Sequence, residues 1–188
     1  IDFPCRVDWQ EQGTKFVDGP MLKVAFPVEV SGGAARFEIP FGSIERSANG
    51  HEYPSQKWMD LSGRTQSGFE YGASILNDSK YGCDVKNGVM RLTLLRSSYD
   101  PDPKPDKGMQ EFTYALYPHK GAWDAKVVRA GYELNNPLIV YVMKSKELNS
   151  SIAQSLDRST KLPEAYSFVS VEPENLIVTA FKKAEDSN

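Results

Sequence analysis

Short stretches in which apolar and polar side chains alternate recur along this chain, and they constrain its fold more than any other feature. Alternation places every second side chain on one face of an extended segment, which is typical of a half-buried strand. It occurs at 22–30, 37–41, 112–116 and 176–181, and the run 138–143 is apolar on both faces. At least seven strands can be counted, with turn signals between them. The pattern predicts a mainly β protein, an antiparallel β-sandwich or large antiparallel sheets, and not a βαβ fold.

Turn residues indicate how some of these segments are connected. Asn87-Gly88 separates 81–86 from 89–95, and these residue types accept the positive φ angles of a tight hairpin turn. Pairing about that turn places 77–82 opposite 93–98. Gly32-Gly33 predicts a second hairpin, between 22–30 and 37–41, with Pro27 at a sheet edge because proline has no N–H for the ladder.

Helical spacing is found in one region only. Apolar residues between Trp123 and Leu134 predict one short helix around 123–133, which Pro137 closes. The loop 99–108 contains three prolines and is predicted to be extended and polar, either a functional loop or a spacer.

Composition excludes several classes of protein. The 188 residues include 22 Lys and Arg and 25 Asp and Glu, a net charge of −3 that does not attract nucleic acid. The longest clean apolar run, 138–143, is far shorter than the ~18 residues of a membrane span. We therefore expect a single β domain over 1–188 with neither nucleic acid nor membrane as partner, and both cysteines, Cys5 and Cys83, as free thiols.

The common catalytic and metal-binding motifs are absent from the sequence. His51 and His119 stand far apart, no C-x-x-C is found, and no G-x-S-x-G or phosphate-binding glycine loop occurs. The acidic loop 100–108 can be read as paired carboxylates, as calcium ligands or as a solvated loop. The stretch 77–82 combines an amide, a carboxylate, a hydroxyl, an ammonium and a phenol, which suits either a site or an ordinary turn.

Several long motifs, in order and with matching spacing, resemble the C-terminal β region of α-mannosidases of glycoside hydrolase family 38. The similarity extends over roughly 23–183, and the nearest subgroup includes microbial, cytosolic and vacuolar enzymes. The motifs are FEIPFG (37–42), KWMDLS (57–62), LNDSKYG (76–82), LTLLR (92–96) and EFTYALYPH (111–119).

The resemblance implies a large β-sandwich of the supersandwich type, similar to galactose mutarotase, in a retaining exo-α-mannosidase that uses a divalent metal, usually zinc. In that family the nucleophile and the metal ligands lie in an N-terminal catalytic domain, and none of those motifs is present here. We therefore expect a non-catalytic portion that is inactive alone, holds no cofactor and lacks the last strands of the region. The segment 13–20 is longer than usual, and the sequence does not reveal its role.

The resemblance also implies where this chain would meet the active site. An arginine on a strand like 90–96 approaches the mannoside in longer members, which favours Arg96, with Arg91 as the alternative. The implied partners are the N-terminal catalytic domain of the same polypeptide, a mannose-containing glycan and a second copy of the chain, in the cytoplasm. The competing readings are a free-standing carbohydrate-binding β-sandwich and a structural or oligomerisation domain. The candidate substrate-proximal or domain-interface residues are Arg96, Lys80, Asp78, Tyr81 and Asp102.

Overall fold

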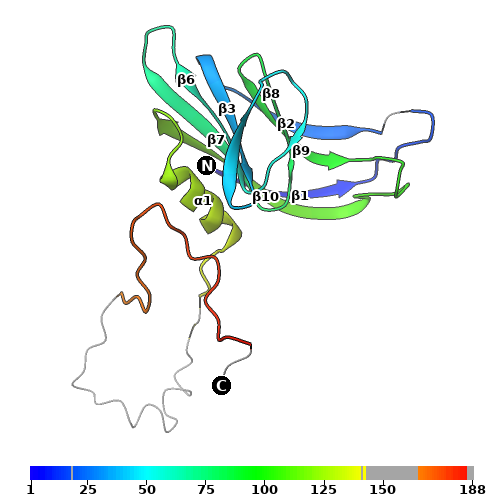
Figure 1. Ribbon diagram of the computed structural model, residues 1–188. Coiled ribbons are helices and arrows are strands. Elements are labelled where there is room, and N and C mark those ends of the chain that lie inside the picture. The colour runs from blue at the N-terminus through cyan, green and yellow to red at the C-terminus, as the bar shows by residue number, and fades with distance from the viewer. Residues whose placement is uncertain (18, 141, 143–164, 186–188) are drawn as a thin grey trace. The chain divides into compact units, whose positions relative to one another are not determined.

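The computed structural model describes residues 1–17, 19–140, 142 and 165–185. The chain divides into two compact units, Ile1–Asn136 and Pro137–Asn188. In the described part, the first unit holds ten strands and one helix (Figure 1). All strand pairs are antiparallel. The predicted mainly β architecture with one short helix is confirmed.

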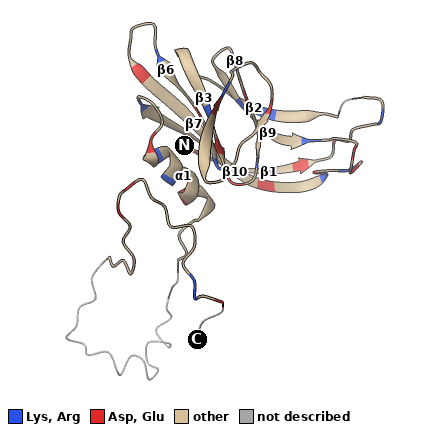
Figure 2. Cartoon of the chain, in the orientation of Figure 1, with Lys and Arg blue, Asp and Glu red and all other residues tan. Residues whose placement is uncertain are grey.

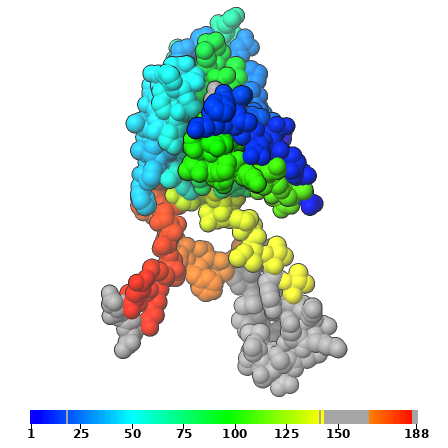
Figure 3. All heavy atoms as spheres, turned by 90° about the vertical axis from the view of Figure 1, so that its right-hand side faces the viewer, coloured from blue at the N-terminus to red at the C-terminus, as the bar shows by residue number. Residues whose placement is uncertain are grey.

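The strands form two sheets. The six-stranded sheet has the order β1 (Asp2–Trp9), β10 (Gly108–Lys120), β7 (Glu70–Asn77), β6 (Trp58–Arg64), β3 (Ser31–Ile39), β4 (Gly42–Arg46). The four-stranded sheet has the order β2 (Met21–Pro27), β9 (Val89–Arg96), β8 (Gly82–Lys86), β5 (Tyr53–Pro54). N-terminal residues, blue in Figure 3, lie beside green residues, since β1 pairs with β10 and β2 with β9.

The main core lies between the two sheets. Phe37, Met59 and Ile75 of the six-stranded sheet are buried in one cluster with Val85 and Leu92 of the four-stranded sheet. The alternation of apolar residues sends these side chains inward from both sheets, and each buried side chain of this size contributes about 1.5–3 kcal/mol. The result is a β-sandwich, as the sequence predicts.

Helix α1 (Ala125–Asn135) covers part of the outer face of the six-stranded sheet. Val127 is fully buried in a second cluster with Trp58 and Leu76. The helix begins two residues later than expected because the Asp124 side chain accepts a hydrogen bond from the Lys126 N–H at 2.8 Å and caps it.

The hairpin at Asn87-Gly88 is confirmed. Asn87 and Gly88 have φ angles of 51° and 73°, and Lys86 pairs with Val89 on either side of them. Both residue types tolerate the left-handed region at low cost, which is why this dipeptide is a reliable turn signal.

The second expected hairpin is wrong. β2 pairs with β9 in the four-stranded sheet, whereas β3 lies between β4 and β6 in the other sheet. Between them Val28, buried in the core, donates its N–H to the Gly88 carbonyl at 2.8 Å as the chain crosses over. Alternation fits a strand in either sheet, because both sheets face the same core. Pro27 does lie on an edge strand, as expected.

The second unit, taken by itself, contains no strand among its described residues. The strand expected at 176–181 is therefore wrong for this structure, since a strand needs a hydrogen-bonded neighbour and no described residue pairs with this segment. Of the run 138–143, residues 141 and 143 lie outside the described residues and the rest form no strand. The expectation of one β domain over 1–188, like that of a supersandwich similar to galactose mutarotase, stays a prediction.

Charged residues of both signs are interspersed over the strands (Figure 2). None of the described helices is long and apolar enough to cross a membrane. Cys5 and Cys83 are both free thiols, as expected.

Candidate functional site

The segment 76–82 is the end of β7 and the link to β8. Asn77 is buried, and its side chain shapes the turn by accepting from the Lys80 N–H at 2.8 Å and donating to the Gln56 carbonyl at 2.7 Å. Asp78 accepts a hydrogen bond from the Thr113 N–H at 2.8 Å, which ties the turn to β10. The side chains of Asn77 and Asp78 therefore stabilise this turn. The sequence was compatible with either this structural role or a functional one.

The next two residues of the segment differ in their surroundings. The Lys80 ammonium lies 4.6 Å from the centre of the Phe112 ring, a cation–π contact that directs it along β10. Tyr81 is 56% exposed and lines a pocket of about 530 Å³ with Glu38, Lys57 and other residues. Three of the motifs found in the sequence, 37–42, 57–62 and 76–82, thus meet at one pocket, and Tyr81 brings a phenol to it.

The pocket at Tyr81 has a fixed ionic wall. The Glu38 carboxylate is buried and accepts from both the backbone N–H and the ammonium of Lys57, the latter at 3.0 Å. Arg46 donates to the Pro54 carbonyl at 2.8 Å. These polar groups can bind hydroxyl groups. Glu38 is the only carboxylate among the lining residues, so the pocket lacks the pair of carboxyl groups that glycoside hydrolysis requires.

Arg96 ends β9 at the surface. Its backbone pairs with Met21, and its N–H donates to Asp106 Oδ2 at 3.3 Å. Its guanidinium has no hydrogen bond or ion pair with any residue that the structure describes. The expected register about Asn87-Gly88 holds up to Cys83–Leu92, and a Cβ at Gly82 would lie 3.2 Å from Thr93 Cβ. The pairing does not continue to Arg96, because Asn77 already belongs to β7 in the other sheet.

The segment 13–20 supports the residue that follows Arg96. Ser97 is fully buried, donates its N–H to the Pro20 carbonyl at 2.9 Å and accepts from Trp9 Nε1 at 2.8 Å. A Cβ at Gly13 would lie 2.2 Å from the Ser97 carbonyl oxygen, and one at Gly19 only 1.5 Å. The two glycines allow the segment to close on Ser97 and hold the end of β9 in place.

Arg91, the alternative to Arg96, is committed to an ionic network on the four-stranded sheet. Its Nε donates to Asp84 Oδ1 at 2.6 Å, and Lys23 Nζ reaches Asp84 at 2.8 Å and Glu52 at 2.6 Å. Asp84 is only 1% exposed. Burial acts to lower the pKa of Lys23, but its hydrogen bonds to Asp84 and Glu52 outweigh burial and raise that pKa. Arg91 is thus occupied within the domain, whereas the Arg96 guanidinium has no such partner among the described residues.

Asp102 lies exposed in the proline-rich loop, where its side chain accepts from the Lys104 N–H at 2.9 Å. Among the residues described, no hydrogen bond or ion pair joins Asp102 to Arg96, Lys80, or Tyr81. The structure therefore brings Asp78 and Lys80 to β10, Tyr81 to a pocket and Arg96 to the end of β9, and it does not gather the candidates into one site.

Sequence reasoning missed a buried carboxylate on the outer face of the six-stranded sheet. Asp60 is fully buried and accepts hydrogen bonds from Ser74 Oγ at 2.7 Å and from the Ser62 hydroxyl. His119 Nε2 lies 2.6 Å from Asp60 Oδ2, within hydrogen-bond distance. The hydrogen bond to Asp60 raises the pKa of His119, against the effect of burial, and the negative charges of Asp60 and Asp124 add to it. Asp60 and His119 are 59 positions apart, and only strand pairing brings them together.

A metal such as zinc does not fit this part of the chain. No group of three or more His, Cys, Asp or Glu side chains suited to a metal occurs among the described residues. The Asp60–His119 pair offers two such ligands, and zinc sites need three or four.

Comparison with known proteins gives a consistent result. Residues 1–104 match the family model described as "Glycosyl hydrolases family 38 C-terminal domain". Human "Alpha-mannosidase 2C1" is 41% identical over 74% of this chain, which corresponds to 13% of that protein. "Alpha-mannosidase G" of Dictyostelium discoideum is 34% identical over 99% of the chain and 16% of its own length.

"Alpha-mannosidase" of Saccharomyces cerevisiae is 34% identical over 100% of the chain and 16% of its own length. The chain thus spans about a sixth or less of the length of these relatives. Its described fold is a β-sandwich of two antiparallel sheets. The chain belongs to glycosyl hydrolase family 38, as a C-terminal domain of that family.

Proposed function

We propose that this chain is the non-catalytic C-terminal β-sandwich portion of a retaining exo-α-mannosidase, and that it supports and completes an active site built by an N-terminal catalytic domain of the same polypeptide. The enzyme would remove terminal α-D-mannosyl residues from a mannose-containing glycan. The observation that carries the proposal is the match of the chain to one limited region of several much longer α-mannosidases. That distribution favours a portion of an enzyme over a free-standing carbohydrate-binding module.

Arg96 is the proposed point of contact with the active site. Its guanidinium is unpaired among the described residues, and the buried Ser97 fixes the strand end from which it projects. A guanidinium presents a planar fork that can bond two sugar hydroxyls or a carboxylate. Lys80, Asp78, Tyr81 and Asp102 remain secondary proposals for the same interface.

The rest of the polypeptide would supply the groups that carry out the reaction. The nucleophile, the general acid and the divalent metal, zinc in our proposal, would all belong to the catalytic domain. Two free cysteines agree with the reducing environment of the cytoplasm, the location that we propose. Association with a second copy is a further proposal, which sedimentation of the longer polypeptide would test.

Activity measurements on the longer polypeptide test the proposal. It should hydrolyse a chromogenic α-mannoside, and the 188 residues alone should not. Arg96→Ala should lower kcat/KM about tenfold or more, a loss of about 1.4 kcal/mol in transition-state stabilisation, with little change in Tm.

Arg6→Ala is the matched control, because Arg6 is also an exposed strand arginine and its ion-pair partner among the described residues, Glu111, is exposed as well. Equal kcat/KM values for the Arg96 and Arg6 variants would refute the proposed contact of Arg96 with the active site. A longer polypeptide without α-mannosidase activity would overturn the proposed function itself.

A further inference from the structure

A second hollow, separate from the Tyr81 pocket, opens on the outer face of the six-stranded sheet. It has a volume of about 530 Å³ and lies over β3, β6 and β7 beside the loop Gly121–Trp123. The sheet surface is uncovered here because Ala34 and Ser62, which are cross-strand neighbours on this face, are small. Volumes of about 300–1,000 Å³ are usual for small-ligand pockets.

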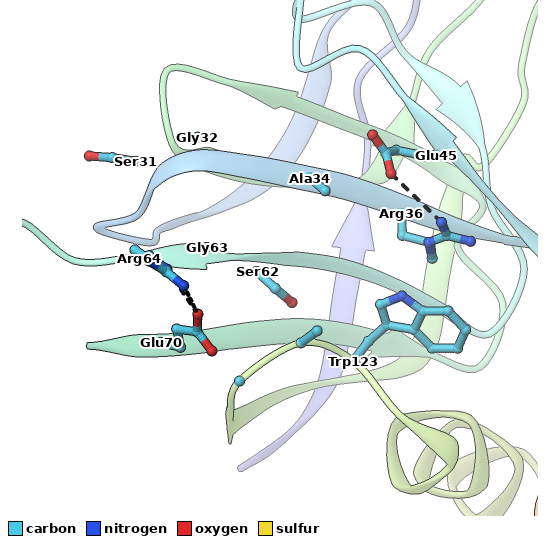
Figure 4. A pocket seen from close by; sticks show the side chains of 12 residues that line it. Ser31, Gly32, Ala34, Arg36, Glu45, Ser62, Gly63, Arg64, Glu70 and Trp123 are labelled. Carbon is cyan, nitrogen blue, oxygen red and sulfur yellow. Dashed lines mark hydrogen bonds and ion pairs between the residues drawn. The ribbon is translucent and has the colours of Figure 1, made fainter. Parts of the chain in front are cut away.

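The charged groups of the hollow stand at opposite ends, with Ser62 between them (Figure 4). At one end Arg64 Nε donates to Glu70 Oε1 at 2.8 Å. At the other, the Arg36 guanidinium lies 3.7 Å from a Glu45 oxygen and 5.1 Å from the centre of the Trp123 ring. Two arginines and two glutamates give the lining no net charge.

That balance selects the kind of ligand. An anion would meet two carboxylates and a cation two guanidinium groups, so neither gains from the lining as a whole. A neutral molecule with many hydroxyls suits it, because arginine forks donate to neighbouring hydroxyl oxygens and glutamates accept from hydroxyl protons. Because the side chains of Ala34 and Ser62 at the bottom of the hollow are small, a sugar ring has room to lie flat between the two Arg–Glu pairs.

The floor and one wall are held in place before any ligand binds. The Ser62 hydroxyl donates its proton to the buried Asp60, which also binds Ser74 and His119. The lone pairs of the Ser62 oxygen therefore remain able to accept a hydrogen bond from a ligand. Trp123 stacks on the buried Trp58 with ring centres 5.2 Å apart. A preorganised site loses less entropy on binding than a mobile one.

We propose that this hollow binds a hexose unit of a mannose-containing glycan, at a site that contains no catalytic residue. The identity of the sugar rests on the proposed function, whereas the preference for a neutral sugar rests on the lining. The site would retain one arm of a branched glycan while another arm reaches the catalytic domain.

A chemical-shift titration of the 188-residue chain with a linear α-linked mannotriose tests this inference. The indole N–H of Trp123 and the amide of Ser62 should shift on addition of the sugar. Ala34→Phe should weaken binding at least tenfold, because Ala34 is exposed within the hollow and a ring at that position fills it. Phenylalanine is also well tolerated in strands, so the variant should fold.

Arg6→Phe is the matched control, since it adds the same side chain on β1, at the opposite edge of this sheet from β4. It should leave the affinity unchanged within about twofold, within the error expected for an independent site. No shift at Trp123, or undiminished binding by the Ala34 variant, would overturn the site. Equal binding of maltotriose would overturn its assignment to mannose. None of these readouts uses enzymatic activity, so failure here is distinguishable from failure of the proposed function.

Discussion

Replacement of Gly19 by alanine tests how the segment 13–20 holds the end of β9. An added Cβ would lie 1.5 Å from the Ser97 carbonyl oxygen and 2.4 Å from its carbonyl carbon. Both are backbone atoms, so no flexible side chain can make room. Gly19 has no positive φ, and the cost of the substitution is therefore steric and not conformational.

The hydrogen bonds of Ser97 set the magnitude. If the segment withdraws, the Ser97 N–H loses the Pro20 carbonyl at 2.9 Å, whereas the bonds of the Ser97 hydroxyl to Trp9 and Glu11 lie outside the segment 13–20. Each such bond contributes a net ~1 kcal/mol. Because Ser97 is fully buried, an unpaired N–H there costs about 1–3 kcal/mol, so Gly19→Ala should lower the free energy of unfolding by about 1–3 kcal/mol and Tm by about 2–12 °C.

Urea unfolding followed by the fluorescence of the three tryptophans measures this change. Gly42→Ala is the control: its nearest neighbour would be an Ile39 side-chain carbon at 3.9 Å, so it should change stability by less than about 0.5 kcal/mol. If Gly19→Ala proves as mild as Gly42→Ala, the packing of this segment against Ser97 does not hold β9, and the argument for a fixed Arg96 is refuted.

Three further outcomes are expected. Asp84→Asn should lower the free energy of unfolding by about 2 kcal/mol, and Arg91→Ala should cost less in that variant than in the wild type; additive urea-unfolding values would contradict the network. The pKa of His119 is raised, so its bond to Asp60 stabilises the fold fully below the ordinary histidine pKa of about 6.5, and this stabilisation is lost as pH rises through the raised pKa. His119→Gln should therefore lower the free energy of unfolding more near pH 5.5 than near pH 9. An equal loss at both pH values would contradict this. Burial raises the pKa of Cys83 to about 12, so iodoacetamide should not modify it in the native protein near pH 8; labelling at Cys83 before unfolding, mapped by mass spectrometry, would refute this.

The sequence predicted the segments that form the candidate site but not how they come together. The motifs 37–42, 57–62 and 76–82 were recognised one by one, and the structure shows that they meet at the pocket lined by Tyr81. The buried carboxylates Glu38 and Asp60 gave no signal, because a charged residue in an alternating strand reads as exposed. Their burial depends on partners from other strands, Lys57 and His119.

The sequence by itself determined the local structure of this protein. Alternation located some of the strands, such as β2 and β10, Asn87-Gly88 fixed one hairpin through its backbone preferences, and apolar spacing located the helix to within two residues. These features depend on neighbours along the chain, whose geometry a short sequence already specifies.

Only the tertiary structure decided which sheet each strand joined. β2 and β3 are consecutive and alternate alike, yet they lie in different sheets, and the order β1-β10-β7 brings the first strand beside the last. The same choice put Asn77 and Arg96 in different sheets and brought His119 to Asp60. Strand pairing joins residues far apart in sequence through backbone groups that every residue carries, so the pattern of side chains does not specify the partner.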